Sequence, residues 1–246
     1  MKQEFATLNS PCSTRKEEHM GFVMTAGELV NRAVDIAKNY KTLYIMGCFG
    51  APMTAANKKR YISNGASGGY NARSDRAAMI NAASADTFGF DCVCLIKGIL
   101  WGWTGEPNAT YGGAKYASNG VPDCNANGMI SLCKGVSTDF SKIEAGEAVW
   151  LDGHIGIYIG NGLAVECTPK WQNRVQITAV GNLGAKAGYN TRTWTKHGKM
   201  PWVDYSAQVE EAPPATEKTY TRAEVEKMFE TAAAAAREAI QKSLDT

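Results

Sequence analysis

The stretch HIGIYIGNGLAVEC, residues 154–167, decides the fold, because apolar side chains alternate with others on both sides of a Gly-Asn-Gly turn signal. This pattern predicts two antiparallel strands joined as a β-hairpin. A two-residue Asn161-Gly162 turn would put the carboxylate of Glu166 on the apolar face, so a three-residue loop over 160–162 is favoured. The apolar face then consists of the cross-strand pairs Ile159–Leu163, Ile157–Val165 and Ile155–Cys167.

The opposite face of this hairpin carries the polar residues. In the favoured register Glu166 lies opposite Gly156 and diagonal to His154. Diagonal neighbours in a sheet are about 7–8 Å apart at Cα, within reach of long side chains, and the glycine between them leaves the space open. We therefore expect Glu166 to orient the imidazole of His154.

A second helical run supplies a nucleophile candidate. DCVCLIKGILWGW, residues 91–103, has Asp91 at the position of an N-cap and Cys92 in the first turn. The partial positive charge of a helix N-terminus lowers the pKa of a thiol, although a buried structural thiol is the commoner role for a lone cysteine. Together, Cys92, His154 and Glu166 provide the nucleophile, base and orienting group of a thiol hydrolase.

The rest of the sequence predicts an α+β protein in which N-terminal helices pack on a central antiparallel β-sheet. Residues 25–40 have helical apolar periodicity, and 41–53 is extended, followed by a polar surface loop to about Arg73. GMISLCKG, residues 128–135, is a short helix candidate. Four strands are expected in EAVWL, HIGIYIG, GLAVECT and RVQITAV, between residues 147 and 180.

The composition indicates four segments. We expect a mobile arm over 1–21, a catalytic domain over 22–205, a linker rich in Glu, Pro, Ala and Thr over 206–219, and a further helix over 220–246. Within the last segment, 221–243 has a capping box and a narrow apolar stripe, so either self-association or docking through it is expected, or else a solvated tail.

Charge and cysteine content limit the partners. The formal net charge is +2 and the basic residues are scattered, which argues against nucleic acid as the partner. No apolar run is long enough for a membrane span or a secretory signal, so synthesis in the cytoplasm and no membrane partner are expected. Seven cysteines suggest mostly free thiols, with a Cys124–Cys133 disulfide as an alternative. We also expect His197 to be a solvated surface residue.

A zinc site is the competing interpretation of the cysteine-rich motif, since zinc accepts four Cys or His ligands. Cys92, Cys94, Cys124, Cys133 and His154 would be its candidates. Cys92 and Cys94 are two apart on a predicted helix and face different directions, and the other two lack a tight knuckle spacing. The sequence therefore favours no metal and no cofactor.

Three blocks of the chain resemble the NlpC-type cell-wall cysteine peptidases, and they occur in the same order. They are LYIMGCFG at 43–50, FDCVCLIKG at 90–98, and GEAVWLDGHIGIYIGNGLAVE at 146–166. The ending TWTKHGKMPWVDY, residues 193–205, resembles the close of phage and prophage endolysin domains of this family. Two departures from the family pattern are Val93-Cys94 in place of a small pair, and Glu166 where histidine is more usual.

The resemblance implies a papain-like fold and a peptidoglycan hydrolase. It implies Cys92 as nucleophile, His154 as base and Glu166 as the third polar residue, with Tyr44 and Asp91 binding the free amine of a stem peptide or shaping the oxyanion site. The expected activity is an endopeptidase acting on the stem peptide of bacterial peptidoglycan. An N-acetylmuramoyl-L-alanine amidase, or a non-catalytic wall-binding or virion module, is the alternative. Action on the wall would follow release from the cytoplasm.

Overall fold

The computed structural model describes residues 21–63 and 69–206, and it is a mixed α and β structure. This agrees with the predicted α+β class at the level of secondary-structure content. The predicted arm over 1–21, linker over 206–219 and helix over 220–246 lie outside the described residues, apart from Gly21 and Ser206.

The main sheet has seven strands in the order β10-β9-β8-β7-β6-β11-β5. All neighbouring pairs are antiparallel except β10 and β9, which run parallel. The sheet is therefore mixed, whereas the sequence predicted an antiparallel one. Its strands are β5 (Lys134–Ser137), β6 (Ala148–Leu151), β7 (His154–Gly160), β8 (Leu163–Thr168), β9 (Arg174–Val180), β10 (Thr191–Arg192) and β11 (Lys196–Lys199).

The β7–β8 hairpin has the predicted register at its centre but a different turn. Ile157 pairs with Val165 as expected, whereas Gly160, rather than Ile159, pairs with Leu163. The two turn residues, Asn161 and Gly162, have φ of 53° and 73°, as the tight type I′ turn requires. A bulge before Gly160 absorbs the extra residue and restores the register.

Helix α1 (Ala26–Asn39) begins where the sequence predicts. Thr25 accepts a hydrogen bond from the amide of Glu28, and the Glu28 carboxylate accepts one from the amide of Thr25 at 2.8 Å, which forms a capping box. The apolar stripe of the helix is buried, because residues three and four apart share one face. The buried residues are Ala26, Leu29, Val30, Ala33, Ile36 and Ala37.

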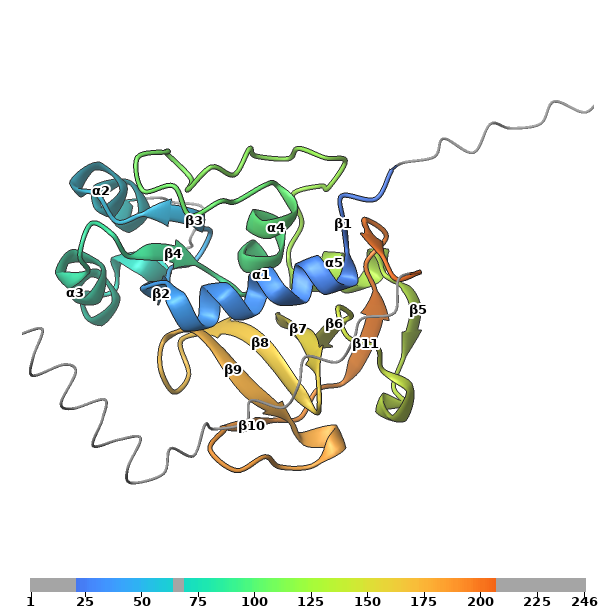
Figure 1. Cartoon of the computed structure of the whole chain (residues 1–246). Coiled ribbons are helices and arrows are strands. Elements are labelled where there is room, and N and C mark those ends of the chain that lie inside the picture. Colours follow the sequence, from blue (N-terminus) through green and yellow to red (C-terminus); the bar gives the residue numbers. More distant parts are fainter. Residues whose placement is uncertain (1–20, 64–68, 207–246) are drawn as a thin grey trace, which may run out of the picture. The chain divides into compact units, whose positions relative to one another are not determined.

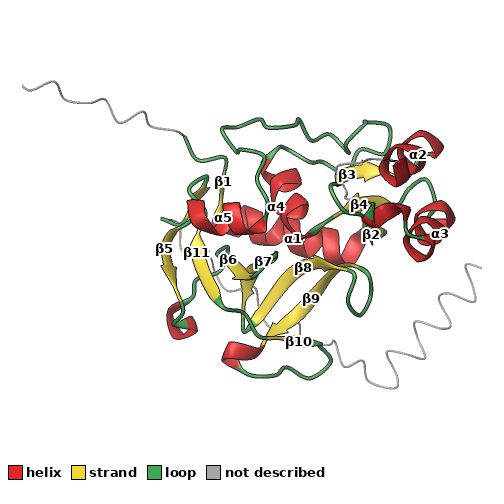
Figure 2. Ribbon diagram, turned by 180° about the vertical axis from the view of Figure 1, so that it is seen from behind, coloured by secondary structure: helices red, strands yellow, loops and turns green. Residues whose placement is uncertain are grey.

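Helices α1 and α4 (Cys92–Leu100) cover the same face of the main sheet. Figure 1 shows α1 lying across strands β7 to β9 with α4 beside it, and Figure 2 shows the same layers from behind. Their apolar side chains form one core with the inward residues of the sheet, among them Ile155, Ile157, Val165, Cys167 and Val175. This packing brings the start of α4 against β7.

A second, smaller cluster occupies the opposite face of the sheet. It contains Tyr158, Ala164, Trp194, Phe140, Val149 and Val180. The sequence predicted a polar face here, but the 3₁₀ turn Phe140–Lys142 and the loop that carries Trp194 cover it. His154 and Glu166 therefore lie beside packed aromatic residues rather than on an open polar surface.

The region between α1 and α4 contains more regular structure than the sequence predicted. A three-stranded sheet in the order β2-β4-β3 adjoins α4. The sequence predicted a loop up to Arg73, but this stretch contains helix α2. Only two residues of α2 are buried, Asn57 and Tyr61, which is too few to give a periodic apolar signal. The elements are β2 (Thr42–Tyr44), β3 (Phe49–Pro52), β4 (Phe88–Phe90), α2 (Ala55–Ser63) and α3 (Ser74–Ala82).

The remaining elements close the domain. Helix α5 (Ala126–Leu132) overlaps the predicted short helix and is capped by Asn125, which accepts a hydrogen bond from the amide of Gly128. Strands β1 (Met24–Thr25) and β12 (Val203–Asp204) pair in parallel, so the two ends of the described region meet.

Candidate active site

Asp91 fixes the start of α4 and the segment before it. One carboxylate oxygen accepts a hydrogen bond from the amide of Cys94 at 2.7 Å, which is the predicted N-cap contact. The other accepts one from the amide of Gly47, also at 2.7 Å. Asp91 therefore holds two segments together, since each of its oxygens binds a backbone amide.

The Cys92 thiol lies at the junction of α4 and β7. Its sulfur is 4.0 Å from the carbonyl oxygen of Gly153, the residue immediately before His154. In the described part of the chain, no hydrogen bond joins the Cys92 thiol to the His154 ring. The structure thus brings the nucleophile candidate beside the backbone that carries the base candidate, without a direct contact between the two side chains.

The pKa of Cys92 differs from the sequence expectation. Burial and the nearby charge of Asp91 raise the pKa of the thiol to about 12, while the backbone amides of Val93, Ile155 and Cys92 itself act in the opposite direction. The helix N-terminus does not outweigh desolvation here, because the residue is only 8% exposed. The resting protein therefore holds Cys92 as a neutral thiol.

His154 and Glu166 make the contact that the hairpin register predicts. The Nε2 atom of His154 is 2.7 Å from an Oε atom of Glu166. A Cβ atom on Gly156 would lie 3.3 Å from Cβ of Glu166 and 2.9 Å from the carbonyl oxygen of Val165, so glycine is what lets the two strands approach. Because Nε2 is engaged, Nδ1 is the ring nitrogen left to accept a proton.

Glu166 is completely buried, at 0% exposure, yet it is ionised. Burial by itself would raise the pKa of this carboxyl, but hydrogen bonds from His154 and Arg192, together with the charge of Arg192, lower it below its usual value. Thr178 Oγ1 donates a further hydrogen bond at 2.7 Å. These donors keep Glu166 ionised, so it accepts the hydrogen bond of His154 Nε2 without taking the proton.

The indole ring of Trp194 stacks on the imidazole ring of His154. The two rings are parallel within 7°, with centroids 5.5 Å apart. The backbone of Trp194 is fixed in turn by Asn182, which accepts from its amide at 2.8 Å and donates to its carbonyl oxygen at 2.9 Å. These contacts restrict the orientation of the imidazole.

Tyr44 lies close to the predicted nucleophile. Burial and the charge of Asp91 raise the pKa of its hydroxyl, which is therefore protonated. Its amide donates to the carbonyl oxygen of Asn173 at 3.0 Å, and its own carbonyl oxygen accepts from Arg76. All five residues named from the sequence thus belong to one region, at the start of α4 and the neighbouring ends of β2, β7 and β8.

Sequence reasoning missed Arg192, Thr178 and Trp194. Thr178 could have been found, because RVQITAV alternates and its polar residues share the face of Glu166 across the β8–β9 pair. Arg192 and Trp194 follow an irregular loop, and their positions carry no periodic signal. Only the tertiary structure brings them to Glu166 and His154.

The sequence suggested that His197 is a solvated surface residue, but the structure shows it buried. It is 3% exposed, its Nδ1 contacts the carboxylate of Glu147, and its Nε2 is 3.0 Å from the carbonyl oxygen of Asp139. The polar stretch TKHGK misled the prediction because β11 lies inside the sheet, between β6 and β5. This second His–Glu pair is part of the sheet rather than of the candidate site.

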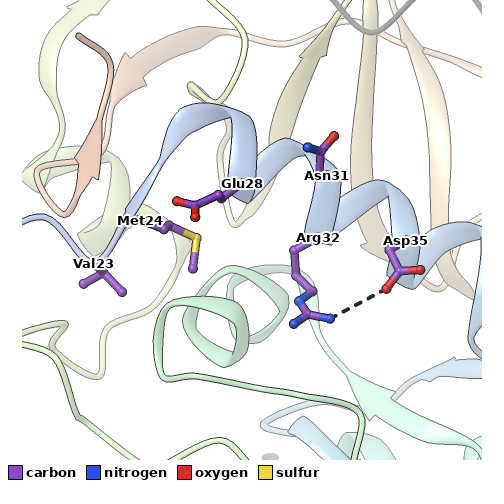
Figure 3. Close-up of a pocket in the computed structure, with 6 residues that line it drawn as sticks. All are labelled: Val23, Met24, Glu28, Asn31, Arg32 and Asp35. Atoms are coloured by element: carbon purple, nitrogen blue, oxygen red, sulfur yellow. Dashed lines mark ion pairs between the residues drawn. The ribbon is translucent and has the colours of Figure 1, made fainter. Parts of the chain in front are cut away.

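A cavity of about 550 Å³ lies elsewhere, along the exposed side of α1. Figure 3 shows its lining residues, where Arg32 pairs with Asp35 at 3.7 Å. The lining consists of Val23, Met24, Glu28, Asn31, Arg32 and Asp35. Since none of these belongs to the Cys92 region, this cavity is separate from the candidate active site.

The described residues contain neither a metal site nor a membrane-spanning helix. Within 21–63 and 69–206, no three His, Cys, Asp or Glu side chains are arranged to hold a metal ion, and Cys124 and Cys133 are both free thiols. None of the helices in these two ranges combines the length and apolar character that a membrane crossing requires.

No family model matches the chain, and no curated protein matches it significantly.

Proposed function

We propose that the chain is a thiol hydrolase of the papain-like, NlpC-type class that cuts an amide bond in the stem peptide of bacterial peptidoglycan. The observation that carries the proposal is the 2.7 Å contact between His154 and the buried Glu166, with the Cys92 sulfur 4.0 Å from the residue before His154. Of the three sequence blocks that resemble this family, 90–98 contains Cys92, and 146–166 contains both His154 and Glu166. Their resemblance supplies the substrate class.

The proposed reaction is an acyl transfer in two steps. The Cys92 sulfur attacks the amide carbonyl while its proton passes to Nδ1 of His154, and the imidazolium then protonates the leaving amine. A thioester to Cys92 remains, which water hydrolyses with His154 again acting as base. Backbone amides at the start of α4 are suited to stabilise the oxyanion.

The raised pKa of Cys92 bears on how this reaction would begin. A resting thiolate–imidazolium pair is not expected, so the proton must leave the thiol as the carbon–sulfur bond forms. Substrate binding would bring the Nδ1 atom of His154 and the thiol into hydrogen-bond contact, as catalytic contacts often tighten only in the complex. Glu166 would then stabilise the imidazolium that forms, in the manner of the acidic residue of a triad.

Mass spectrometry of digested, purified peptidoglycan tests the proposal. The wild-type chain should release fragments with a new amine end inside the stem peptide, and Cys92→Ala should release none. Cys124→Ser is the matched control, because this thiol is half-buried and lies outside the site. Intact stem peptides freed from muramic acid would instead identify an amidase, and binding without any release would identify a non-catalytic wall module.

A further inference from the structure

Arg192 binds the carboxylate that orients His154, and it does so with two nitrogen atoms. Its Nε donates to Oε1 of Glu166 at 2.8 Å, and its Nη2 is 2.8 Å from Oε2. This two-pronged geometry is the strongest form of arginine–carboxylate pair and also fixes the plane of the carboxylate. Arg192, Glu166 and His154 therefore form a continuous chain that ends beside Cys92.

The fold has a dedicated element for presenting Arg192. Strand β10 is the parallel edge strand, and it pairs Arg192 with Val180 of β9. A Cβ atom on Gly181 would lie 2.8 Å from the hydroxyl of Thr193, so only glycine allows the segment 191–193 to pack this closely. Two hydrogen bonds between the Asn182 side chain and the Trp194 backbone fix the same segment at its other end.

Two tryptophans enclose the guanidinium. Its central carbon is 4.9 Å from the ring centroid of Trp171 and 5.5 Å from that of Trp194, both within the range of cation–π contact. The Arg192 side chain is 13% exposed. Trp171 has a φ of 62°, a left-handed conformation that is costly for a bulky residue and tends to persist at functional sites.

Charge balance explains why a cation is needed here. A buried carboxylate without a counter-charge is unstable, and a neutral His154 offers none. The neighbouring thiols of Cys92 and Cys167 and the carboxyl of Asp91 supply no cation. Lys170 lies 4.6 Å from the centroid of the Trp171 ring, but among the described residues it forms no ion pair with Glu166. Arg192 is therefore the cation that keeps Glu166 ionised before His154 receives a proton.

We propose that Arg192 is a positioning residue, which holds Glu166 in its ionised form and so keeps the proton of neutral His154 on Nε2, leaving Nδ1 free for the Cys92 thiol. The catalytic part of this inference rests on the proposed function. The effect of Arg192 on His154 does not, because it requires no substrate.

The inference predicts what happens when the cation is removed. In Arg192→Gln the Glu166–His154 pair has an unbalanced buried negative charge, so it takes up its next proton at higher pH. That proton either resides on His154 or passes to Glu166 and turns the imidazole into its Nδ1–H form. Both outcomes change the ring nitrogen signals of His154. Arg192→Lys keeps the charge but not the two-pronged contact, so an intermediate result is expected.

Nitrogen-15 NMR of the imidazole rings, recorded against pH on the full chain, tests this directly. The chain has only three histidines, and His154→Gln assigns the signal. We expect the titration midpoint of His154 to move upward by about one pH unit or more in Arg192→Gln and by less in Arg192→Lys. Arg174→Gln is the matched control, since Arg174 lies on the neighbouring strand β9 and its Nε bonds Gln172 instead.

An unchanged His154 midpoint and tautomer in Arg192→Gln and Arg192→Lys would overturn the inference. If Arg192→Gln does not fold, Arg192→Lys decides. It keeps the positive charge, which favours folding, but it loses the two-pronged contact that holds Glu166. A parallel peptidoglycan assay separates the two proposals. If Arg192→Gln shows the NMR shift but the wild-type protein releases no fragments, the proposed function is refuted and the role of Arg192 remains intact.

Discussion

Asp91 accepts a hydrogen bond from the amide of Gly47 at 2.7 Å while its other oxygen caps α4. The sequence blocks containing Tyr44 and Cys92 are thus joined by one carboxylate. Their separation in the sequence, across α2 and α3, does not separate them in space. This relationship makes Asp91 a structural residue of the site, whatever it also contributes to substrate binding.

Replacement of Asp91 by alanine should therefore destabilise the fold as well as the site. The loss of the N-cap costs about 0.5–2 kcal/mol, and the unpaired amide of Gly47 adds about 1–3 kcal/mol. Urea denaturation measures the change in the free energy of unfolding. Asp35→Ala, at an exposed ion pair on α1, should change it by less than about 1 kcal/mol. Equal effects of the two substitutions would contradict the assignment.

Gly156→Ala should disturb the contact between His154 and Glu166. The new methyl group would lie 2.9 Å from the carbonyl oxygen of Val165 and 3.1 Å from the Trp194 ring. We expect a loss of about 1–3 kcal/mol in stability from overpacking, with a larger relative loss of hydrolysis.

Gly27→Ala is the control for this substitution, since a Cβ there meets nothing closer than 4.0 Å. It lies in α1, where alanine is the better helix former, so stability should stay the same or rise by up to about 1 kcal/mol. Full activity in Gly156→Ala would show that the orientation of His154 does not depend on close strand approach.

The centre of the fold could be predicted from the sequence because its signals are local. Alternation gave β7 and β8, and the need to keep Glu166 off the apolar face gave the pairing of Ile157 with Val165. The cap of α4 at Asp91 was equally direct, since it depends on residues within one turn.

What could not be predicted depends on contacts between distant segments. Arg192 reaches Glu166 only because β10 adds in parallel to the sheet edge, and His197 is buried only because β11 enters between β6 and β5. The raised pKa of Cys92 has the same origin. Helix position alone suggested a lowered value, but burial by the surrounding core has the larger effect.

The ionised state of Glu166 should appear in the acid stability of the protein. Its pKa in the folded state is below the ordinary value of 4.5, so its contribution is fully present above that value. It is lost as pH falls through the lower, folded-state pKa. In Glu166→Gln, the free energy of unfolding should therefore fall less steeply than in the wild type as the pH decreases below about pH 5. A fall as steep as that of the wild type would contradict the assignment.

The buried pair of His197 and Glu147 should matter for stability and not for chemistry. His197→Ala leaves Glu147 without its partner inside the sheet, which costs about 3–5 kcal/mol when the remaining group stays charged. Lys199→Ala, on the same strand, removes a partly exposed ion pair with Glu144 and should cost about 0–1 kcal/mol. Thermal unfolding distinguishes them, and a smaller loss for His197→Ala would refute the pair's structural role.

The central claim is that the Cys92 sulfur attacks the substrate carbonyl. Intact-protein mass spectrometry after mixing with a purified muropeptide and rapid acid quench tests it most directly. The account predicts a wild-type adduct with the mass of the acyl half of the peptide, located on Cys92. It predicts neither adduct nor hydrolysis in Cys92→Ala. Continued hydrolysis by Cys92→Ala, or an adduct on another residue, would contradict it.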